Sequence, residues 1–561
     1  MTMKTLYAVS TSVGSGKTVA AVQYMARPQA CAQDFIYVAP TIRLVNQTEQ
    51  LLRRTLESQH SIRSVHLIHS ESNTGDGYGA AREALLTINE QPTGLGRVVL
   101  LTTATFIRIL SSINDPSRWC LILDEAFAPV SFINYHLGPH PEDGLSYFHE
   151  LFHIDSSDNY RVLPAVGKSG LVDEVSLGQV DHCGQRHLGQ QQLAQAVSNP
   201  AMRCELVVPR GIRLTGGAGV FDTSALTGSR SLLFASYITP ELFGLFKETI
   251  ILSALFEHTV LHHLWSRCFG VRFMGHPWFS QTHLRDVHKE QGPWVAVGHL
   301  LHQSDKASKH NLFSNRHTGE PGETALGERV LDHLVNLGAQ FLKGSRYLLQ
   351  TNNGTGYGAG SALLPDGAHP IPVISHGLND FKDTDNILAL AVTNPNPQEA
   401  EWVQTRTGLT KEQVLQAYRI HTVYQAVGRT SIRAGQQTPR KKVFLVAGYE
   451  DARLLHQLFQ GSTWLGQVGD QPPLKTVRDG VSEQGTMNQL AQAINDYLDK
   501  LDPDIQSLSS RSVKASVAPE CAQRTWTEAA RMACMSNAVW RKDGHRFRRL
   551  DHGFTAEEVD L

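Results

Sequence analysis

The sequence predicts an α/β protein with two parallel-sheet domains, an insertion in the first domain and a mainly helical C-terminal region. Short apolar runs alternate with helix-like stretches in two separate parts of the chain, as in parallel sheets covered by helices. A glycine-rich loop with a lysine follows the first apolar run, which is typical of phosphate-binding α/β domains. The length of 561 residues also exceeds what one hydrophobic core usually organises.

The prediction of the first domain is based on short runs that are apolar throughout. Such runs suit strands that are buried on both faces. The expected strands are 5–9, 35–39, 98–103, 120–124 and 249–253. The stretches between them have helix-like patterns, and the expected helices are 17–25, 43–57 and 79–89. Because strands and helices alternate, we expect ligands beyond the carboxyl ends of the strands.

A second set of apolar runs predicts the second domain. Its expected strands are 345–350, 371–375, 386–392 and 442–447, and its expected helices are 326–341 and 411–427. The stretch from about 130 to 245 interrupts the first set; it is rich in Gly, His and Pro, has weaker patterns and is interpreted as an insertion. The expected limits are 1–130 plus 246–255 for domain one, 131–245 for the insertion, 256–450 for domain two and 451–561 for the C-terminal region.

Composition limits the functional classes. With 41% hydrophobic and 19% charged residues, the chain has the profile of a globular enzyme. A net charge of -2 means that contact with a polyanion must come from local basic surface. The seven cysteines include no CxxC pair, so no zinc ribbon or disulfide framework is predicted, and a cytoplasmic location is expected. No run of apolar residues is long enough to predict a membrane span.

The strongest motif is the segment from Thr11 to Thr18, TSVGSGKT, between the first strand and the first helix. Gly14 and Gly16 allow the sharp turn that exposes backbone N–H groups to phosphate. Lys17 is expected to reach the β- and γ-phosphates of ATP, and the hydroxyl of Thr18 to hold Mg²⁺. The residues expected to bind the nucleotide are Gly14, Ser15, Gly16, Lys17 and Thr18.

Two acids end the apolar run 120–124. Asp124 is expected to bind Mg²⁺ together with Thr18, and Glu125 to orient and deprotonate the attacking water. A strand followed by Asp-Glu is common, but a phosphate loop about a hundred residues upstream favours the catalytic interpretation.

In order along the chain, these motifs resemble those of superfamily 2 DEAD/DEAH-like helicases, and a phage or mobile-element type stays open. The resemblance covers roughly residues 5–450 and implies two RecA-like domains of the P-loop NTPase class. It also implies ATP and Mg²⁺ as cofactors and nucleic acid as partner, DNA more than RNA. Ser253-Ala254 resembles the coupling motif III, with Leu255 in place of the usual threonine.

The segment 425–433, QAVGRTSIR, resembles motif VI, which is usually written QxxGRxxR. The resemblance gives Gln425, Arg429 and Arg433 catalytic roles and places Gly428 at the nucleotide. A guanidinium delivered from a facing domain would stabilise charge on the γ-phosphate and couple hydrolysis to domain motion. The second arginine stands four residues after Arg429 rather than three, so Arg429 fits the motif better.

Other motifs of the resemblance imply contacts to a nucleic-acid backbone. The residues that inherit this expectation are Thr41, Arg43, Thr102, Thr103, Gly377 and Asn379. Hydroxyl, guanidinium and backbone N–H groups all suit phosphate oxygens, and such contacts carry no sequence information. A threonine after a strand is, however, more often a helix cap.

The C-terminal stretch 525–550 resembles a helix-turn-helix, with a second helix near Trp540. In such a unit Arg541, Lys542 and Arg546 would contact phosphates. An amphipathic docking helix with a solvated basic tail is the equal alternative. Protein partners are expected through the insertion or through this region.

The sequence as a whole favours an ATP-dependent helicase or translocase that hydrolyses Mg-ATP between two lobes. One alternative is an ATP-switched nucleic-acid-binding component of a replication or defence complex, without unwinding. A further alternative, a phage packaging ATPase, would need a C-terminal nuclease, whereas residues 256–450 carry the arginine pair of motif VI.

Overall fold

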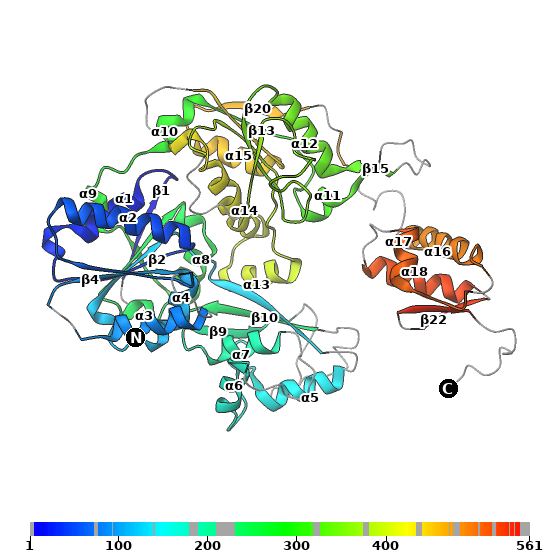
Figure 1. Cartoon of the computed structure of the whole chain (residues 1–561), viewed down its shortest axis with the longest axis horizontal. Coiled ribbons are helices and arrows are strands. Elements are labelled where there is room, and N and C mark those ends of the chain that lie inside the picture. The colour runs from blue at the N-terminus through cyan, green and yellow to red at the C-terminus, as the bar shows by residue number, and fades with distance from the viewer. Residues whose placement is uncertain are drawn as a thin grey trace. The chain divides into compact units, whose positions relative to one another are not determined.

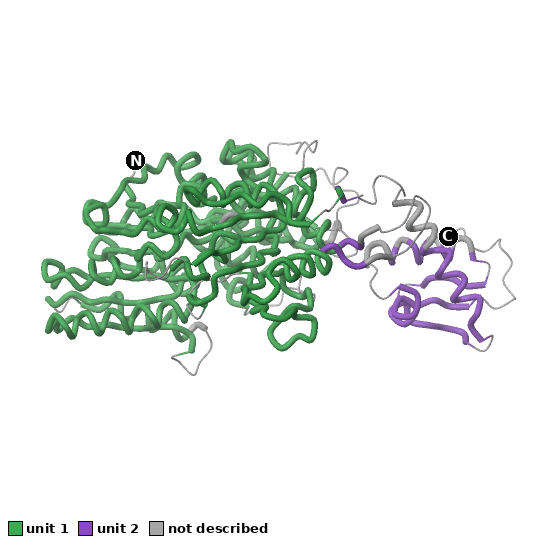
Figure 2. The backbone as a smooth tube through the Cα atoms, turned by 90° about the horizontal axis from the view of Figure 1, so that it is seen from above, with its two compact units in different colours: residues 1–313, 331–472 green, residues 314–330, 473–561 purple. Residues whose placement is uncertain are grey.

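The computed structural model describes most of the chain. The described residues are 5–71, 77–91, 94–137, 141–178, 189–208, 231–317, 326–373, 381–433, 440–469, 472–474, 483–502, 505–518, 523–537, 539–543 and 545–549. These residues form two compact units (Figure 2), of which unit 1 comprises 1–313 and 331–472 and unit 2 comprises 314–330 and 473–561. Among the described residues, none of the helices combines the length and the apolar composition that a membrane span needs.

The first sheet of unit 1 has seven parallel strands in the order β12-β1-β11-β5-β2-β4-β3. Its strands are β1 (Leu6–Thr11), β2 (Asp34–Ala39), β3 (Ser64–Ile68), β4 (Arg97–Thr102), β5 (Trp119–Asp124), β11 (Glu248–Ala254) and β12 (Phe273–Met274). Every residue of β2 and β5 is buried, as expected of strands covered on both faces. The α/β class with parallel sheets is thus confirmed.

Helices cover both faces of this sheet (Figure 1). One face carries α1 (Lys17–Ala26), α2 (Ile42–Ser58) and α9 (Pro277–Gln281), and the other carries α3 (Gly77–Asn89), α4 (Thr103–Ile109) and α8 (Val260–Phe269). Alternate residues of each strand enter the two cores, as the period of a β-strand requires: Ile36 and Val38 face α3 and α4, whereas Phe35 and Tyr37 face α1 and α2.

The expected limit of the first domain at residue 255 is too early. The helix α8 packs in the core of the first sheet, and β12 pairs in parallel with β1. Two residues make β12 too short to show a sequence pattern, and β3 is only partly buried, so neither was expected.

The insertion forms its own antiparallel sheet in the order β6-β10-β9-β8-β7. Its strands are β6 (Val130–His136), β7 (Phe152–Asp155), β8 (Arg161–Pro164), β9 (Met202–Leu206) and β10 (Ser231–Ile238). Its helices are α5 (Pro141–Leu151), α6 (Ser169–Ser176) and α7 (Gln190–Ser198), which contribute side chains to the insertion's core.

The second sheet of unit 1 has six parallel strands in the order β17-β16-β18-β19-β13-β20. Its strands are β13 (Val295–His299), β16 (Tyr347–Gln350), β17 (Ala368–Ile371), β18 (Asn386–Ala389), β19 (Lys442–Val446) and β20 (Thr463–Gln467). Its helices are α10 (Val287–Gln291), α11 (Lys309–Phe313), α12 (Val330–Phe341), α14 (Lys411–Val427) and α15 (Tyr449–Leu458). The helix α13 (Pro397–Thr407) packs on α8 and α14, and its buried residues belong to the core of the first sheet. Because β20 lies beyond residue 450, the second domain extends further than expected.

The described residues of the C-terminal region are mainly helical, as expected, and unit 2 also contains short strands. Its elements are β14 (Asn315–His317), β15 (Leu326–Arg329), α16 (Glu483–Asp499), β21 (Ser507–Ser509), α17 (Ser510–Val517), α18 (Gln523–Ser536), β22 (Trp540–Asp543) and β23 (Arg546–Arg549).

The expected second helix of a helix-turn-helix at 525–550 is wrong. The chain there forms the antiparallel pair β22–β23, with Trp540 and Phe547 buried between polar neighbours. This alternation is the period of a strand.

Candidate active site

The loop between β1 and α1 has the backbone that phosphate binding requires. Gly14 and Gly16 take positive φ values of 71° and 95°, which L-residues with side chains adopt rarely. Gly16 is the N-cap of α1, so the loop ends where the N–H groups of the helix are exposed and its dipole is positive. The loop therefore has a backbone geometry that suits an anion. It lies on the first lobe, which is the part of unit 1 built on the first sheet.

Lys17 is a buried cation inside this loop. Only 7% of its surface is exposed. Its Nζ donates to the carbonyl oxygen of Ser12 at 2.9 Å and to Oγ1 of Thr11 at 3.3 Å. Burial lowers the pKa of Lys17, while the charges of Glu125 and Asp124 act in the opposite direction.

Asp124 stands at the end of β5 with its carboxylate inside the protein. Its Oδ2 accepts hydrogen bonds from Oγ1 of Thr18, at 2.8 Å, and from the hydroxyl of Tyr37. Burial raises the pKa of Asp124 to about 6, with a further rise from the charge of Glu125. The hydrogen bonds from Tyr37 and Thr18 favour the charged form and oppose this rise. Thr18 and Asp124, expected as metal ligands, thus have adjacent oxygen atoms.

Glu125 has an unusual backbone for a residue with a side chain. Its φ is 88°, and its N–H donates to the carbonyl oxygen of Leu252 in the adjacent strand β11 at 2.7 Å. Such conformations cost of the order of 1–3 kcal/mol and persist where the surroundings fix them. The turn places the Glu125 carboxylate next to the second lobe, where Oε2 accepts from Nε2 of Gln425 at 3.2 Å.

The second lobe, built on the second sheet, contributes the end of α14 and the turn that follows. Arg429 is 3% exposed, and its Nη2 donates to Oε1 of Gln425 at 3.3 Å. Burial lowers the pKa of Arg429 to about 9, and the charge of Arg433 lowers it further. Arg433 lies against the phosphate loop, because a Cβ added to Gly14 would stand 2.9 Å from its Cγ. Both arginines of the motif therefore reach the first lobe.

These groups surround one cavity of about 330 Å³. Both lobes line it: the loop and strand ends of the first lobe face the two arginines of the second. The lining residues are Val13, Gly14, Ser15, Gly16, Lys17, Thr18, Val19, Leu44, Gln47, Thr48, Leu51, Asp124, Glu125, Arg429 and Arg433. Three cations and two acids in one partly buried space can bind a polyphosphate with a divalent metal ion.

The phosphate loop also packs directly on the second lobe. The N–H of Val13 donates to the hydroxyl of Tyr424 at 2.9 Å, and this hydroxyl lies 2.5 Å from Nε2 of His288. Gly428, expected at the nucleotide, does not line the cavity: a Cβ there would stand 2.8 Å from Cγ2 of Val13. Its role in this structure is close packing between the lobes.

Two of the expected nucleic-acid contacts act as helix caps. Oγ1 of Thr41 accepts from the N–H of Leu44 at 3.2 Å, and Oγ1 of Thr102 accepts from the N–H of Thr105 at 3.3 Å.

The other expected contact residues have varied positions. Arg43 is exposed in the first turn of α2, and Thr103 is the first residue of α4. Gly377 and Asn379 lie outside the described residues.

The two residues expected to couple hydrolysis to domain motion lie in the protein interior. Ser253 and Ala254 are fully buried in β11 and register with Ser10 and Thr11 of β1. Ala254 packs in the core of the second lobe, so this strand end contacts both lobes, although neither residue lines the cavity.

Tyr37 and Gln47 are site residues that the sequence did not indicate. Tyr37 lies within an apolar run and reaches Asp124 only because β2 and β5 are neighbours in register. Gln47 faces the cavity from α2. Neither belongs to a motif, so only the order of the strands and the helix packing could reveal them.

Comparison with known proteins finds a similarity in the N-terminal part of the chain. Residues 2–127 match the model of the DEAD/DEAH box helicase family. Comparison with curated proteins gave no match.

Among solved structures, an XPD helicase overlaps 82% of this chain and 96% of its own, with 11% identity and a TM-score of 0.43. S. cerevisiae Dbp5 bound to RNA and ADP BeF3 overlaps 82% and 85%, with 8% identity and a TM-score of 0.33. The Escherichia coli DEAH/RHA helicase HrpB overlaps 94% and 58%, with 13% identity and a TM-score of 0.31. TM-scores this low carry no argument about function. Residues 2–127 of this chain are thus similar to the DEAD/DEAH box helicase family.

Proposed function

We propose that this chain is an ATP-dependent helicase or translocase that hydrolyses Mg-ATP in the cavity between its two lobes. The observation that carries the proposal is the link across the lobes, in which Gln425 donates to Glu125 and Arg429 donates to Gln425. This chain of hydrogen bonds connects the acid at the end of β5 with the arginine at the end of α14. Chemistry in the cavity would therefore depend on how the two lobes are held together.

The residues around the cavity fit a nucleoside triphosphate with its metal ion. The turn at Gly14 and Gly16 suits phosphate oxygens, and the buried cation of Lys17 suits the charge of the β- and γ-phosphates. Thr18 and Asp124 offer adjacent oxygen ligands of the kind that Mg²⁺ prefers. Mg²⁺, when bound, would neutralise charge on the phosphate oxygens.

Glu125 is the proposed general base. Its carboxylate would orient a water molecule and accept its proton, and Gln425 would fix the carboxylate through the 3.2 Å hydrogen bond. Arg429 and Arg433 would stabilise the negative charge that develops on the γ-phosphoryl oxygens. Because these arginines belong to the second lobe, movement of the lobes would switch this stabilisation on and off.

The track proposed for this motor is a nucleic-acid backbone, DNA in preference to RNA, at the carboxyl ends of β2 and β4. Thr41 follows β2, and Thr102 ends the neighbouring strand β4. As a helix cap the Thr41 hydroxyl oxygen accepts a hydrogen bond, and its O–H group would donate to a phosphate oxygen. The Thr102 hydroxyl also shares a 2.9 Å hydrogen bond with the hydroxyl of Thr105 and would have to exchange it for a phosphate contact. Arg43 and Thr103 would complete this surface.

The test is the ATPase rate measured side by side with single-stranded DNA, duplex DNA and RNA. We expect stimulation by nucleic acid that Glu125→Gln abolishes while ATP binding persists. Glu450→Gln is the matched control, since Glu450 is an exposed glutamate on α15 outside the cavity. Wild-type hydrolysis by Glu125→Gln would refute the catalytic assignment.

A strand-displacement assay separates the motor from its alternatives. ATP-driven displacement of a labelled strand supports the helicase. Strong stimulated ATPase without displacement or movement would favour an ATP-switched binding component instead. Metal-dependent DNA cleavage would favour a packaging enzyme.

A further inference from the structure

Unit 2 has the element order of a helix pair followed by a β-hairpin. The chain runs α16, β21, α17, α18, β22, β23, and its three strands form an antiparallel sheet in the order β21-β23-β22. The central strand β23 pairs with both others, so the hairpin is attached to the helix pair through β21. This is the winged-helix arrangement, in which one helix and the hairpin can contact nucleic acid together.

We propose that unit 2 binds duplex DNA, with α18 in the major groove and the β22–β23 hairpin on the phosphate backbone. The helix-turn-helix expected at 525–550 thus shifts toward the N-terminus, to α17 and α18. The inference rests on unit 2 alone and does not depend on hydrolysis in unit 1.

The helix α18 buries one face and exposes another. Trp526, Ala529, Ala530 and Ala533 are buried in the core of unit 2, and their spacing of three and four residues defines one stripe of the helix. Three alanines in this stripe allow α16 to pack closely. The exposed residues Thr527 and Arg531 stand four positions apart and so share another face.

Positive charge in unit 2 is concentrated in the segment from β21 to β23. Residues 507–549 carry nine lysines and arginines but three acids, whereas 483–499 carry three acids and no lysine or arginine. A chain with a net charge of -2 can attract a polyanion only through local basic surface of this kind.

The hairpin places like charges opposite one another. Arg541 of β22 and Arg548 of β23 are direct partners in the register, on the face opposite the buried Trp540 and Phe547. Like charges at facing positions destabilise a strand pair. Arg548 forms an ion pair with Asp543 at 3.2 Å, and a phosphate backbone would relieve the remaining repulsion.

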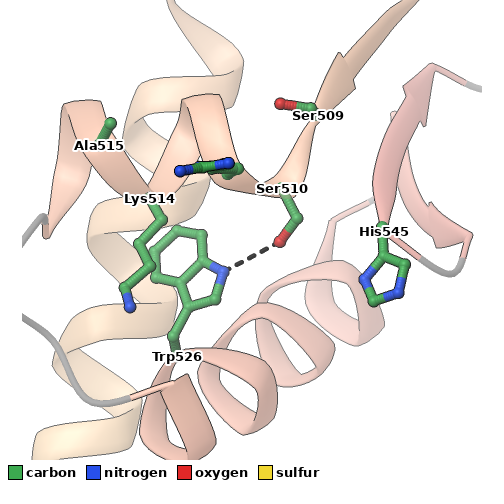
Figure 3. Close-up of a pocket in the computed structure, with 7 residues that line it drawn as sticks. Ser509, Ser510, Lys514, Ala515, Trp526 and His545 are labelled. Atoms are coloured by element: carbon green, nitrogen blue, oxygen red, sulfur yellow. Dashed lines mark hydrogen bonds between the residues drawn. The ribbon is translucent and has the colours of Figure 1, made fainter. Parts of the chain in front are cut away.

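A cavity of about 590 Å³ lies between the start of α17 and the hairpin (Figure 3). Arg511, Lys514 and His545 line it, together with the N-terminal residues of α17. At its base, Nε1 of Trp526 donates to Oγ of Ser510 at 2.9 Å, which fixes α18 against α17. Arg511 lies in the first turn of α17, where the helix dipole favours a phosphate group, whereas Lys514 lies in the last turn. A phosphate backbone on the hairpin would therefore extend along this cavity to α17.

The geometry selects B-form DNA rather than an RNA duplex. The major groove of B-DNA admits an α-helix, whereas that of A-form RNA is too deep and narrow for side chains to read. The helix α18 has 14 residues, enough to lie along such a groove.

The experiment measures binding of the full chain, without nucleotide, to a fluorescein-labelled DNA duplex by anisotropy at several salt concentrations. We expect the double variant Arg541→Ala with Arg546→Ala to bind on the order of tenfold more weakly and to lower the salt slope by about two. Arg541→Lys with Arg546→Lys should largely restore binding, because phosphate contacts need the charge. Arg161→Ala with Arg453→Ala, which removes two exposed arginines of unit 1, is the matched control.

Three results would overturn the proposal. The first is wild-type affinity and salt slope in the hairpin double variant, and the second is equal or tighter binding of the matching RNA duplex. The third concerns α18: Arg531→Ala should weaken duplex binding, and wild-type affinity in that variant would refute the groove position. Thermal melting of each variant establishes that unit 2 stays folded. Since no ATP is present, failure of the proposed ATPase would leave these measurements unaffected.

Discussion

The two lobes of unit 1 contribute to the cavity in different ways. The first lobe supplies its groups from the carboxyl ends of parallel strands: the loop after β1, with Lys17, and the acids after β5. The second lobe supplies Gln425, Arg429 and Arg433 from the end of a single helix and the turn after it. We infer that the first lobe can hold the phosphates alone, whereas hydrolysis needs both lobes.

Among substitutions in the second lobe, Arg429→Ala is expected to have the largest effect. Hydrolysis should fall by about a thousandfold, because an arginine that stabilises the developing charge acts mainly in the transition state. ATP affinity should change only a few-fold. Single-turnover ATPase assays and binding of a fluorescent ATP analogue measure the two quantities, and an equal loss in both would remove the distinction between the lobes.

Arg429→Lys is the control for charge. A lysine keeps the positive charge but cannot keep the planar fork that donates to Gln425 while facing the cavity. We therefore expect little rescue of hydrolysis. Full rescue would show that charge alone is needed.

Lys17→Ala should differ from Arg429→Ala, because its main effect should be on ATP binding. Loss of the buried cation in the loop is expected to weaken ATP binding roughly a hundredfold, equivalent to about 2.7 kcal/mol. The same fluorescent analogue reports the change. Tight binding by Lys17→Ala would mean that the first lobe is not the main phosphate site.

Gln425→Ala tests the link between the lobes and should have a smaller effect, about tenfold on hydrolysis. The side chain orients Glu125 and Arg429 but is not itself the base or the cation. A double-mutant cycle of ATPase rates with Glu125→Gln should show strong non-additivity, since both residues act as one unit. Additive effects would mean that the hydrogen bond does not couple the lobes.

The sequence predicted the strands that are buried on both faces, because a run such as 35–39 has no polar position to obscure it. Short or edge strands such as β12 could not be predicted, because two residues show no sequence pattern. The basic residues of β22 and β23 match a DNA-binding helix in composition, but their alternation of buried and exposed positions is that of a strand pair.

Within the site, motif residues could be predicted because the chemistry restricts their type and order. Tyr37 could not, because its role follows only from the neighbouring positions of β2 and β5. Spacing was also a poor guide to Arg433, which lines the cavity despite standing one residue later than the motif requires.

Glu248 begins β11, at the opposite end of the strand from Ala254. A substitution at Glu248 can therefore test the stability of the first lobe separately from ATP hydrolysis. Its Oε2 lies 3.8 Å from Nε2 of His276 and accepts from the hydroxyl of Tyr24 at 2.8 Å. The thiol of Cys120 also donates to it, at 3.4 Å. These groups lower the pKa of Glu248 to about 2, and the hydrogen bond with the His276 imidazole has the largest effect.

Because the pKa of Glu248 in the folded protein lies below its ordinary value of 4.5, its contribution is fully present above pH 4.5 and is lost as the pH falls toward 2. Glu248→Gln should therefore reduce the free energy of unfolding at pH 7 by about 2 kcal/mol, with the difference from wild type shrinking below pH 4.5. Urea denaturation across this range measures it. ATPase activity of the folded variant at pH 7 should equal that of the wild type, whereas a loss would show that the two ends of β11 are coupled.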